Sequence, residues 1–95
     1  MFNNQRYATK GITNTVPLVT QIILWDCIDS MKVELKDYLQ VFKLVANGSN
    51  QQVMHGQEEP TYERTFTFPT DEPITAKIFV IDDETHTTML LAEEY

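Results

Sequence analysis

Apolar residues recur along most of this chain with the period of two that is typical of β-strands. In residues 62–68, three aromatic residues fall on one face, while Glu63 and two threonines fall on the other. Residues 36–46 carry apolar side chains on both faces, which indicates a strand whose two sides are both covered. Short turns separate these segments, and Gly48 suits the left-handed conformation that one of them needs. The pattern predicts strands over residues 5–13, 36–46, 51–57, 62–68, 75–81 and 85–92.

Residues 16–31 depart from this period and predict a helix that is apolar on several sides. Thr13 and Thr15 offer N-cap oxygens, and Pro17 suits a first helical turn. We expect one side of the helix to pack against the sheet. The other side needs a second cover, which could be a long loop, the chain termini or a second copy of the protein. The side expected to face the sheet carries Leu18, Ile22, Trp25 and Ile28, widened by Leu24 and Met31.

The order is a strand, a helix and then several strands joined by short loops, so consecutive strands are expected to be antiparallel. The predicted fold class is α+β in a single domain of residues 1–95. One helix in the N-terminal half packs on a curved, mainly antiparallel sheet of five or six strands. A barrel of the Sm or SH3 type is the alternative, because bent strands after a helix would also fit it.

Negative charge is concentrated in the second half of the chain. Residues 1–57 carry five basic and four acidic side chains, a net charge of +1, whereas residues 58–95 carry two basic and ten acidic ones, a net charge of −8. The acids cluster at predicted turns or loops, at residues 58–59, 71–72 and 82–84. If these turns meet at one end of the sheet, they form an acidic face for a basic protein surface. Otherwise they are solvated turns that keep the sheet edges soluble.

Residues 52–62 form the densest polar stretch of the chain. In a functional interpretation, His55, Gln57, Glu58 and Tyr62 line one pocket that holds a small ligand or transfers a proton, because histidine titrates near neutral pH. In a structural interpretation, His55 and Gln57 share one face of a strand, and their side chains satisfy backbone groups at a bulge near Gly56.

Other chemistry is expected to be absent. Cys27 falls within the apolar helix, where a free thiol behaves as a small hydrophobe. Two histidines and one cysteine lack metal-ligand spacing, and no cofactor-binding or nucleophile motif is present, so we expect no catalytic residue, metal or cofactor, and no enzyme. Seven dispersed basic residues predict no direct nucleic-acid binding. A single cysteine and short apolar runs predict a cytoplasmic protein without membrane association.

Several runs of residues can be compared with a known family. They are RYATKGI at residues 6–12, YLQVF at 38–42, HGQEEPTY at 55–62 and MLLAEEY at 89–95, together with Met1, Phe2, Pro17 and Trp25. The chain thereby resembles a short family of low-GC Gram-positive bacteria and their phages and plasmids, known only as domain of unknown function nine hundred and sixty. The resemblance covers nearly the whole chain. It implies a single domain of bacterial or phage-borne origin and assigns no catalytic residue.

Three hypotheses on function follow. The favoured one is a non-catalytic interaction protein whose acidic surface binds a basic protein, which for a phage or mobile element would be an inhibitor that occludes a nucleic-acid-binding protein. The alternatives are a small-ligand or proton-transfer site around His55, Glu58 and Tyr62, and a homodimeric structural module that buries the second side of the helix. The predicted binding residues are His55, Gln57, Glu58, Glu59, Tyr62, Glu63, Asp71, Glu72, Asp82, Asp83 and Glu84.

Overall fold

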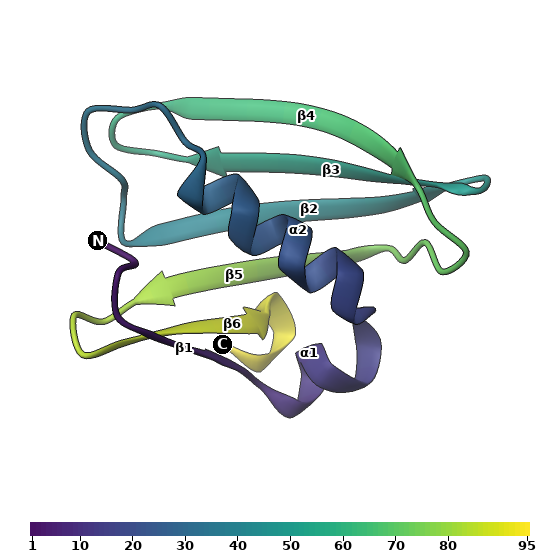
Figure 1. Ribbon diagram of the computed structural model, residues 1–95, viewed down its shortest axis with the longest axis horizontal. Helices are drawn as coiled ribbons and strands as arrows, with labels where there is room; N and C mark the ends of the chain where they lie inside the picture. Colours follow the sequence, from purple (N-terminus) through teal and green to yellow (C-terminus); the bar gives the residue numbers. More distant parts are fainter.

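The computed structural model describes residues 1–95 and confirms the predicted α+β class. One six-stranded sheet carries the helices on a single face (Figure 1). Across the sheet the strand order is β1-β6-β5-β2-β3-β4; β1 and β6 are parallel, and every other neighbouring pair is antiparallel. The elements are β1 (Gln5–Ala8), α1 (Lys10–Thr15), α2 (Leu18–Asp29), β2 (Leu39–Asn47), β3 (Asn50–Gln57), β4 (Tyr62–Pro69), β5 (Ala76–Asp82), β6 (His86–Leu91) and the 3-10 turn η1 (Ala92–Glu94).

The sheet is open, with β1 and β4 as its two edges, so the barrel alternative is wrong. The connection between β4 and β5 returns past the ends of β3 and β2, and the buried Gln51 side chain holds it there. Its amide nitrogen donates to Ile74 O at 2.9 Å, and its amide oxygen accepts from Ile74 N at 2.8 Å. A buried amide is stable here because both of its ends are hydrogen-bonded.

The strand expected over residues 5–13 ends at Ala8, and the short helix α1 follows it. Thr9 is the N-cap of α1, and its hydroxyl oxygen accepts from Ile12 N at 3.3 Å. Gly11 and its polar neighbours are weak helix formers. We attribute the helix to the fully buried Ile12, because short helices depend on tertiary packing.

The helix α2 is shorter than expected, and only part of the expected side is buried: Leu24, Ile28 and Met31 are buried as expected. Pro17 precedes its first turn and makes no side-chain cap. Leu18 and Ile22, expected to face the sheet, are 69% and 57% exposed, and Val19 beside them is also exposed. Because the helix is apolar almost all round, the spacing of its apolar residues cannot select a buried face. The residues it buries are Thr20, Gln21, Leu24, Cys27 and Ile28.

The two faces of the sheet differ in cover. The face under the helices forms the core, with Phe42, Leu44, Val53, Ile78 and Val80 fully or almost fully buried beneath Leu24 and Ile28. The opposite face carries the alternate positions of the same strands and has no α-helix over it (Figure 1); at β5, Tyr95 after η1 packs edge-on against Phe79. The two-sided apolar pattern of residues 36–46 therefore marks one covered face and one face left open by this chain.

Candidate functional site

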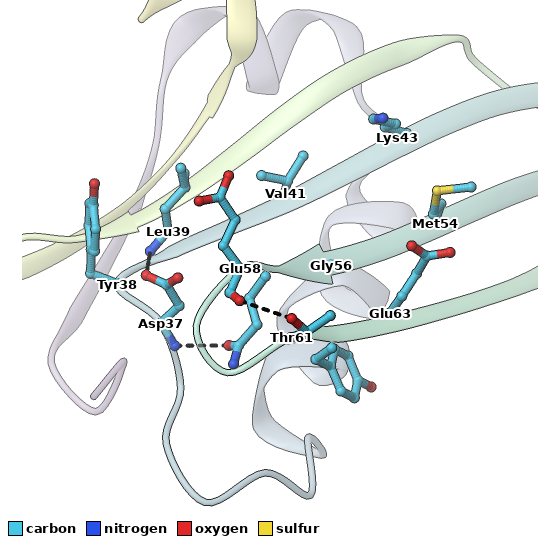
Figure 2. A pocket seen from close by; sticks show the side chains of 12 residues that line it. Asp37, Tyr38, Leu39, Val41, Lys43, Met54, Gly56, Glu58, Thr61 and Glu63 are labelled. Atoms are coloured by element: carbon cyan, nitrogen blue, oxygen red, sulfur yellow. Dashed lines mark hydrogen bonds between the residues drawn. The ribbon is translucent and has the colours of Figure 1, made fainter.

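A groove of about 250 Å³ lies on the open face, over β2, β3 and the start of β4 (Figure 2). Leu39, Val41 and Met54 supply its apolar floor. Gly56 lies between Val41 and Glu63 in the strand register, and its lack of a side chain leaves the floor open at that point. The groove thus follows from the alternation of β2 and β3, whose second set of side chains faces away from the core.

Carboxylates stand around this floor. Figure 2 shows Glu58 and Glu63 on opposite sides of Gly56, and both residues line the groove. The only ion pairs of the structure are Arg6 with Asp29 and His86 with Asp83, so the carboxylates of Glu58 and Glu63 have no cationic partner. Two unpaired carboxylates beside an apolar floor are suited to a guanidinium or ammonium group on an apolar stem.

The side chain of Gln57 fixes the end of the groove. Its amide oxygen accepts from Asp37 N at 2.8 Å and from Gln40 Nε2 at 2.7 Å. Its amide nitrogen donates to Leu35 O at 3.1 Å and to Pro60 O at 2.8 Å. These four bonds join the loop before β2 to the turn after β3, so the groove has a rigid rim before any partner binds. Gln57 satisfies backbone groups as the structural interpretation expected, but these belong to the flanking loops, and the expected bulge near Gly56 is absent because β3 pairs there in unbroken register.

His55 is fully buried on the helix-covered face and does not line the groove. Its Nε2 lies 2.7 Å from Gln40 Oε1. Because the Gln40 amide nitrogen donates to Gln57, the network assigns the proton to His55 Nε2 and leaves its Nδ1 as an acceptor without a partner. The ring stacks on Phe42 with centroids 4.3 Å apart. Burial, together with the smaller effect of the nearby Arg64 charge, lowers the pKa of His55 to about 4.

Gln57, Glu58 and Tyr62 of the predicted shared pocket line the groove without His55, but the Tyr62 ring lies on the helix-covered side, edge-on to the His55 ring with the centroids 5.3 Å apart. This placement removes the imidazole that the proton-transfer hypothesis requires. His55 and Gly56 are consecutive residues of β3, so they point to opposite faces of the sheet. The His55 ring faces α2, and Gly56 faces the groove. Eight lining residues were not predicted from the sequence, although the second apolar face of residues 36–46 indicated some of them. They are Asp37, Tyr38, Leu39, Val41, Lys43, Met54, Gly56 and Thr61.

In the turn between β5 and β6, the aspartate carboxylates accept hydrogen bonds from groups of the protein itself. The buried Asp82 carboxylate accepts from Phe2 N at 2.6 Å, from Asn4 Nδ2 at 2.9 Å and from Glu84 N at 2.8 Å. Burial opposes its ionisation, but these donors outweigh that effect and hold the pKa of Asp82 below its ordinary value. Asp83 accepts from His86 N, which lowers the pKa of Asp83. Asp82 and Asp83 thus hold the turn and the N-terminus together.

The three acidic clusters do not meet at one end of the sheet, so that expectation is wrong. Successive turns of antiparallel strands alternate between the two ends. The β3–β4 turn with Glu58 and Glu59 therefore lies at the same end as the β5–β6 turn, whereas the β4–β5 connection with Asp71 and Glu72 lies at the other (Figure 1). The order of the predicted strands along the chain would by itself have placed Asp71 and Glu72 at the opposite end of the sheet.

The fold and the groove define a small α+β module with one uncovered sheet face. The chain belongs to the family described as "Staphylococcal protein of unknown function (DUF960)", whose profile matches residues 5–94. The family resemblance read from the sequence is thereby confirmed. A solved structure, described as the crystal structure of the protein of unknown function from Enterococcus faecalis, has 26% sequence identity and a TM-score of 0.83, and the match covers 98% of this chain and 92% of that one.

The search of curated proteins found no match. Among the helices, none has the length and apolar character needed to cross a membrane. No group of three or more His, Cys, Asp or Glu side chains is arranged to hold a metal ion.

Proposed function

We propose that this protein is a non-catalytic binding module that captures a basic segment of a partner protein in the groove over β2, β3 and β4. The observation that carries the proposal is the pair of carboxylates, Glu58 and Glu63, that stand without a cationic partner beside the floor of Val41 and Met54. In this mode an arginine or lysine lays its stem along the floor, and its charged head lies between the carboxylates.

The charge distribution supports the same partner. The net charge of −8 over residues 58–95 attracts a basic surface from a distance and raises the rate of encounter. Lys43, which also lines the groove and has no ion pair, repels a second cation further along the floor. The groove therefore favours one basic residue followed by an apolar or acidic one over a uniformly basic stretch.

A partner whose basic segment normally contacts nucleic acid would be blocked while bound, because one surface cannot engage both. In this role the protein is an inhibitor of a nucleic-acid-binding protein. Glu58 and Glu63 would occupy an arginine that otherwise binds a phosphate, through charge-assisted hydrogen bonds of similar geometry. No catalytic step is part of the proposal, because His55 faces the core rather than the groove.

The test uses a capped Arg-Val-Glu tripeptide titrated into the ¹⁵N-labelled protein. We expect amide shifts at Val41, Gly56 and Glu63 that weaken as salt is raised, since exposed ion pairs are screened. Reversal of both groove carboxylates, Glu58→Lys with Glu63→Lys, should abolish the shifts. The matched control, Asp71→Lys with Glu72→Lys, makes the same change of net charge at the other end of the sheet and should retain them. Equal loss in both variants would leave only a general charge effect and refute the groove.

A further inference from the structure

The edge strand β4 has an outer side that this chain leaves unpaired. It runs for eight residues and pairs only with β3. The backbone hydrogen bonds outside the regular elements include none from residues 62–69; the nearest joins Thr70 N to Ser49 O beyond the strand. The other edge strand, β1, has only four residues. A row of free N–H and C=O groups on β4 is therefore available to another strand.

Of the usual devices that protect a sheet edge, β4 has only the charged side chains of Glu63 and Arg64, near its start. Its register with β3 continues without a bulge from Tyr62 to Pro69. It contains no lysine, and its one proline is its last residue. On the helix-covered side, Phe66 and Phe68 are only half-buried and stack with ring centroids 6.3 Å apart. A long edge with little protection, next to partly exposed aromatic rings, is typical of a strand that pairs with another chain.

We propose that a second copy of the chain pairs with this one, β4 to β4, antiparallel about a two-fold axis at Thr65. Such pairing joins the two six-stranded sheets into one and keeps their helices on the same face. In this register Arg64 lies opposite the partner's Phe66, and Tyr62 lies opposite the partner's Phe68. On the open face, Glu63 lies opposite the partner's Thr67.

The side chains are complementary to themselves in this register. Arg64 already lies over Phe66 of its own chain, with its guanidinium carbon 4.9 Å from the ring centroid, and across the axis the same contact would form with the partner's ring. Tyr62 would extend the stack of Phe66 and Phe68 into the partner. No two like charges face each other. An isologous interface must be complementary to itself, so this absence of like-charge pairs favours the register.

Neighbouring registers are less favourable. An axis at Glu63 or at Arg64 would place that residue opposite its own copy, and like charges directly opposite each other are destabilising. An axis at Phe66 would bring Pro69, which has no N–H, into the ladder opposite Glu63. The register at Thr65 avoids both defects. It also leaves the two grooves on one continuous face, although the dimer does not depend on what the groove binds.

The test begins with sedimentation of the intact protein over a range of concentrations, where we expect a reversible dimer. Thr65→Pro should remove the dimer, with circular dichroism to confirm that the variant is folded. A monomer at every concentration would overturn the proposal.

Cysteine cross-linking tests the axis even if the proline variant does not fold. Under oxidation, Thr65→Cys should give a disulfide-linked dimer, because residue 65 faces its own copy across the axis. Thr67→Cys is the matched control, exposed on the same face of the same strand but opposite Glu63 of the partner, and it should stay monomeric. Cys27 is buried, so the native thiol gives little background. Equal cross-linking of both variants, or of neither, would refute the interface at Thr65.

Discussion

The β3–β4 turn and the β5–β6 turn lie at the same end of the sheet and carry similar acidic sequences, yet their carboxylates do different things. In the β5–β6 turn, Asp82 and Asp83 accept hydrogen bonds from backbone N–H groups of the turn, and Asp82 also binds Phe2 N. Beside the β3–β4 turn, Glu58 and Glu63 have neither ion pairs nor side-chain hydrogen bonds to protein groups. One turn uses its charge for stability, and the other leaves it available for a partner.

Side-chain length explains much of this difference. An aspartate can reach the N–H two residues ahead of it, as Asp82 does with Glu84 at 2.8 Å and Asp83 does with Thr85 at 3.1 Å. A glutamate is one methylene longer and less suited to that local bond, so its carboxylate extends away from the turn. Acidic clusters that look equivalent in net charge therefore separate into structural and available groups once Asp and Glu are distinguished.

The groups near the two turns should lose their contributions to the free energy of unfolding in different pH ranges as the solution is acidified. This is the largest effect we expect. The β3–β4 side is held by the network of Gln57, Gln40 and neutral His55. The pKa of His55 falls from 6.5 to about 4 on folding, so the unfolded chain binds the proton more readily. Stability is complete above pH 6.5 and declines as the pH falls towards 4, by about 3 kcal/mol in total. Urea unfolding across this range measures it.

A second decline should follow below pH 4.5, because the pKa values of Asp82, Asp83, Asp29 and Glu94 are lowered in the folded state and their contributions disappear on protonation. His55→Gln should flatten the profile between pH 6.5 and 4 while leaving that lower decline in place. His86→Gln is the control, since the half-buried His86 is the other histidine of the chain and lies outside the network. If His86→Gln flattened the upper range and His55→Gln did not, the assignment of the two ranges would be wrong.

Removal of the Asp82 carboxylate is the next largest effect. Asp82→Ala leaves Phe2 N buried without an acceptor and releases the turn, at a cost of about 2 kcal/mol in the free energy of unfolding. Asp71→Ala, at an exposed acid of the β4–β5 connection, should change the stability by less than about 0.5 kcal/mol. Equal losses in the two variants by denaturant unfolding would remove the distinction between an inward and an outward acid.

The sequence predicted the strands of the second half well, because alternation over residues 62–68 and short hairpin loops leave few alternatives. Only part of the buried side of α2 was predicted, Leu24 and Ile28 among it, since a helix that is apolar nearly all round gains its orientation from the sheet. Ile12 and α1 were missed for a related reason, as packing outweighs the weak helix propensity around Gly11. At the candidate site, Glu58 and Gln57 were found from local polarity. Lys43 and Met54 were not, because only strand pairing brings them to the same groove.

Neutralisation of the groove carboxylates should have the smallest effect on folding. Glu58→Gln with Glu63→Gln removes two charges that stabilise nothing within the chain, so the free energy of unfolding should stay within about 0.5 kcal/mol of the original. Denaturant unfolding of this variant beside Asp82→Ala makes the comparison direct. The same pair of changes should weaken the capped Arg-Val-Glu peptide strongly, because both of its charged contacts are lost.

A stability loss as large as that of Asp82→Ala would place Glu58 and Glu63 among the structural acids. The groove would then lose the observation on which its function rests, because a carboxylate engaged within the fold is not available to a partner. Unchanged stability with lost peptide binding would instead separate the two turns as argued. Retention of folded structure in the variant also ensures that the peptide result reports on the groove rather than on unfolding, which the Asp82 variant alone cannot do.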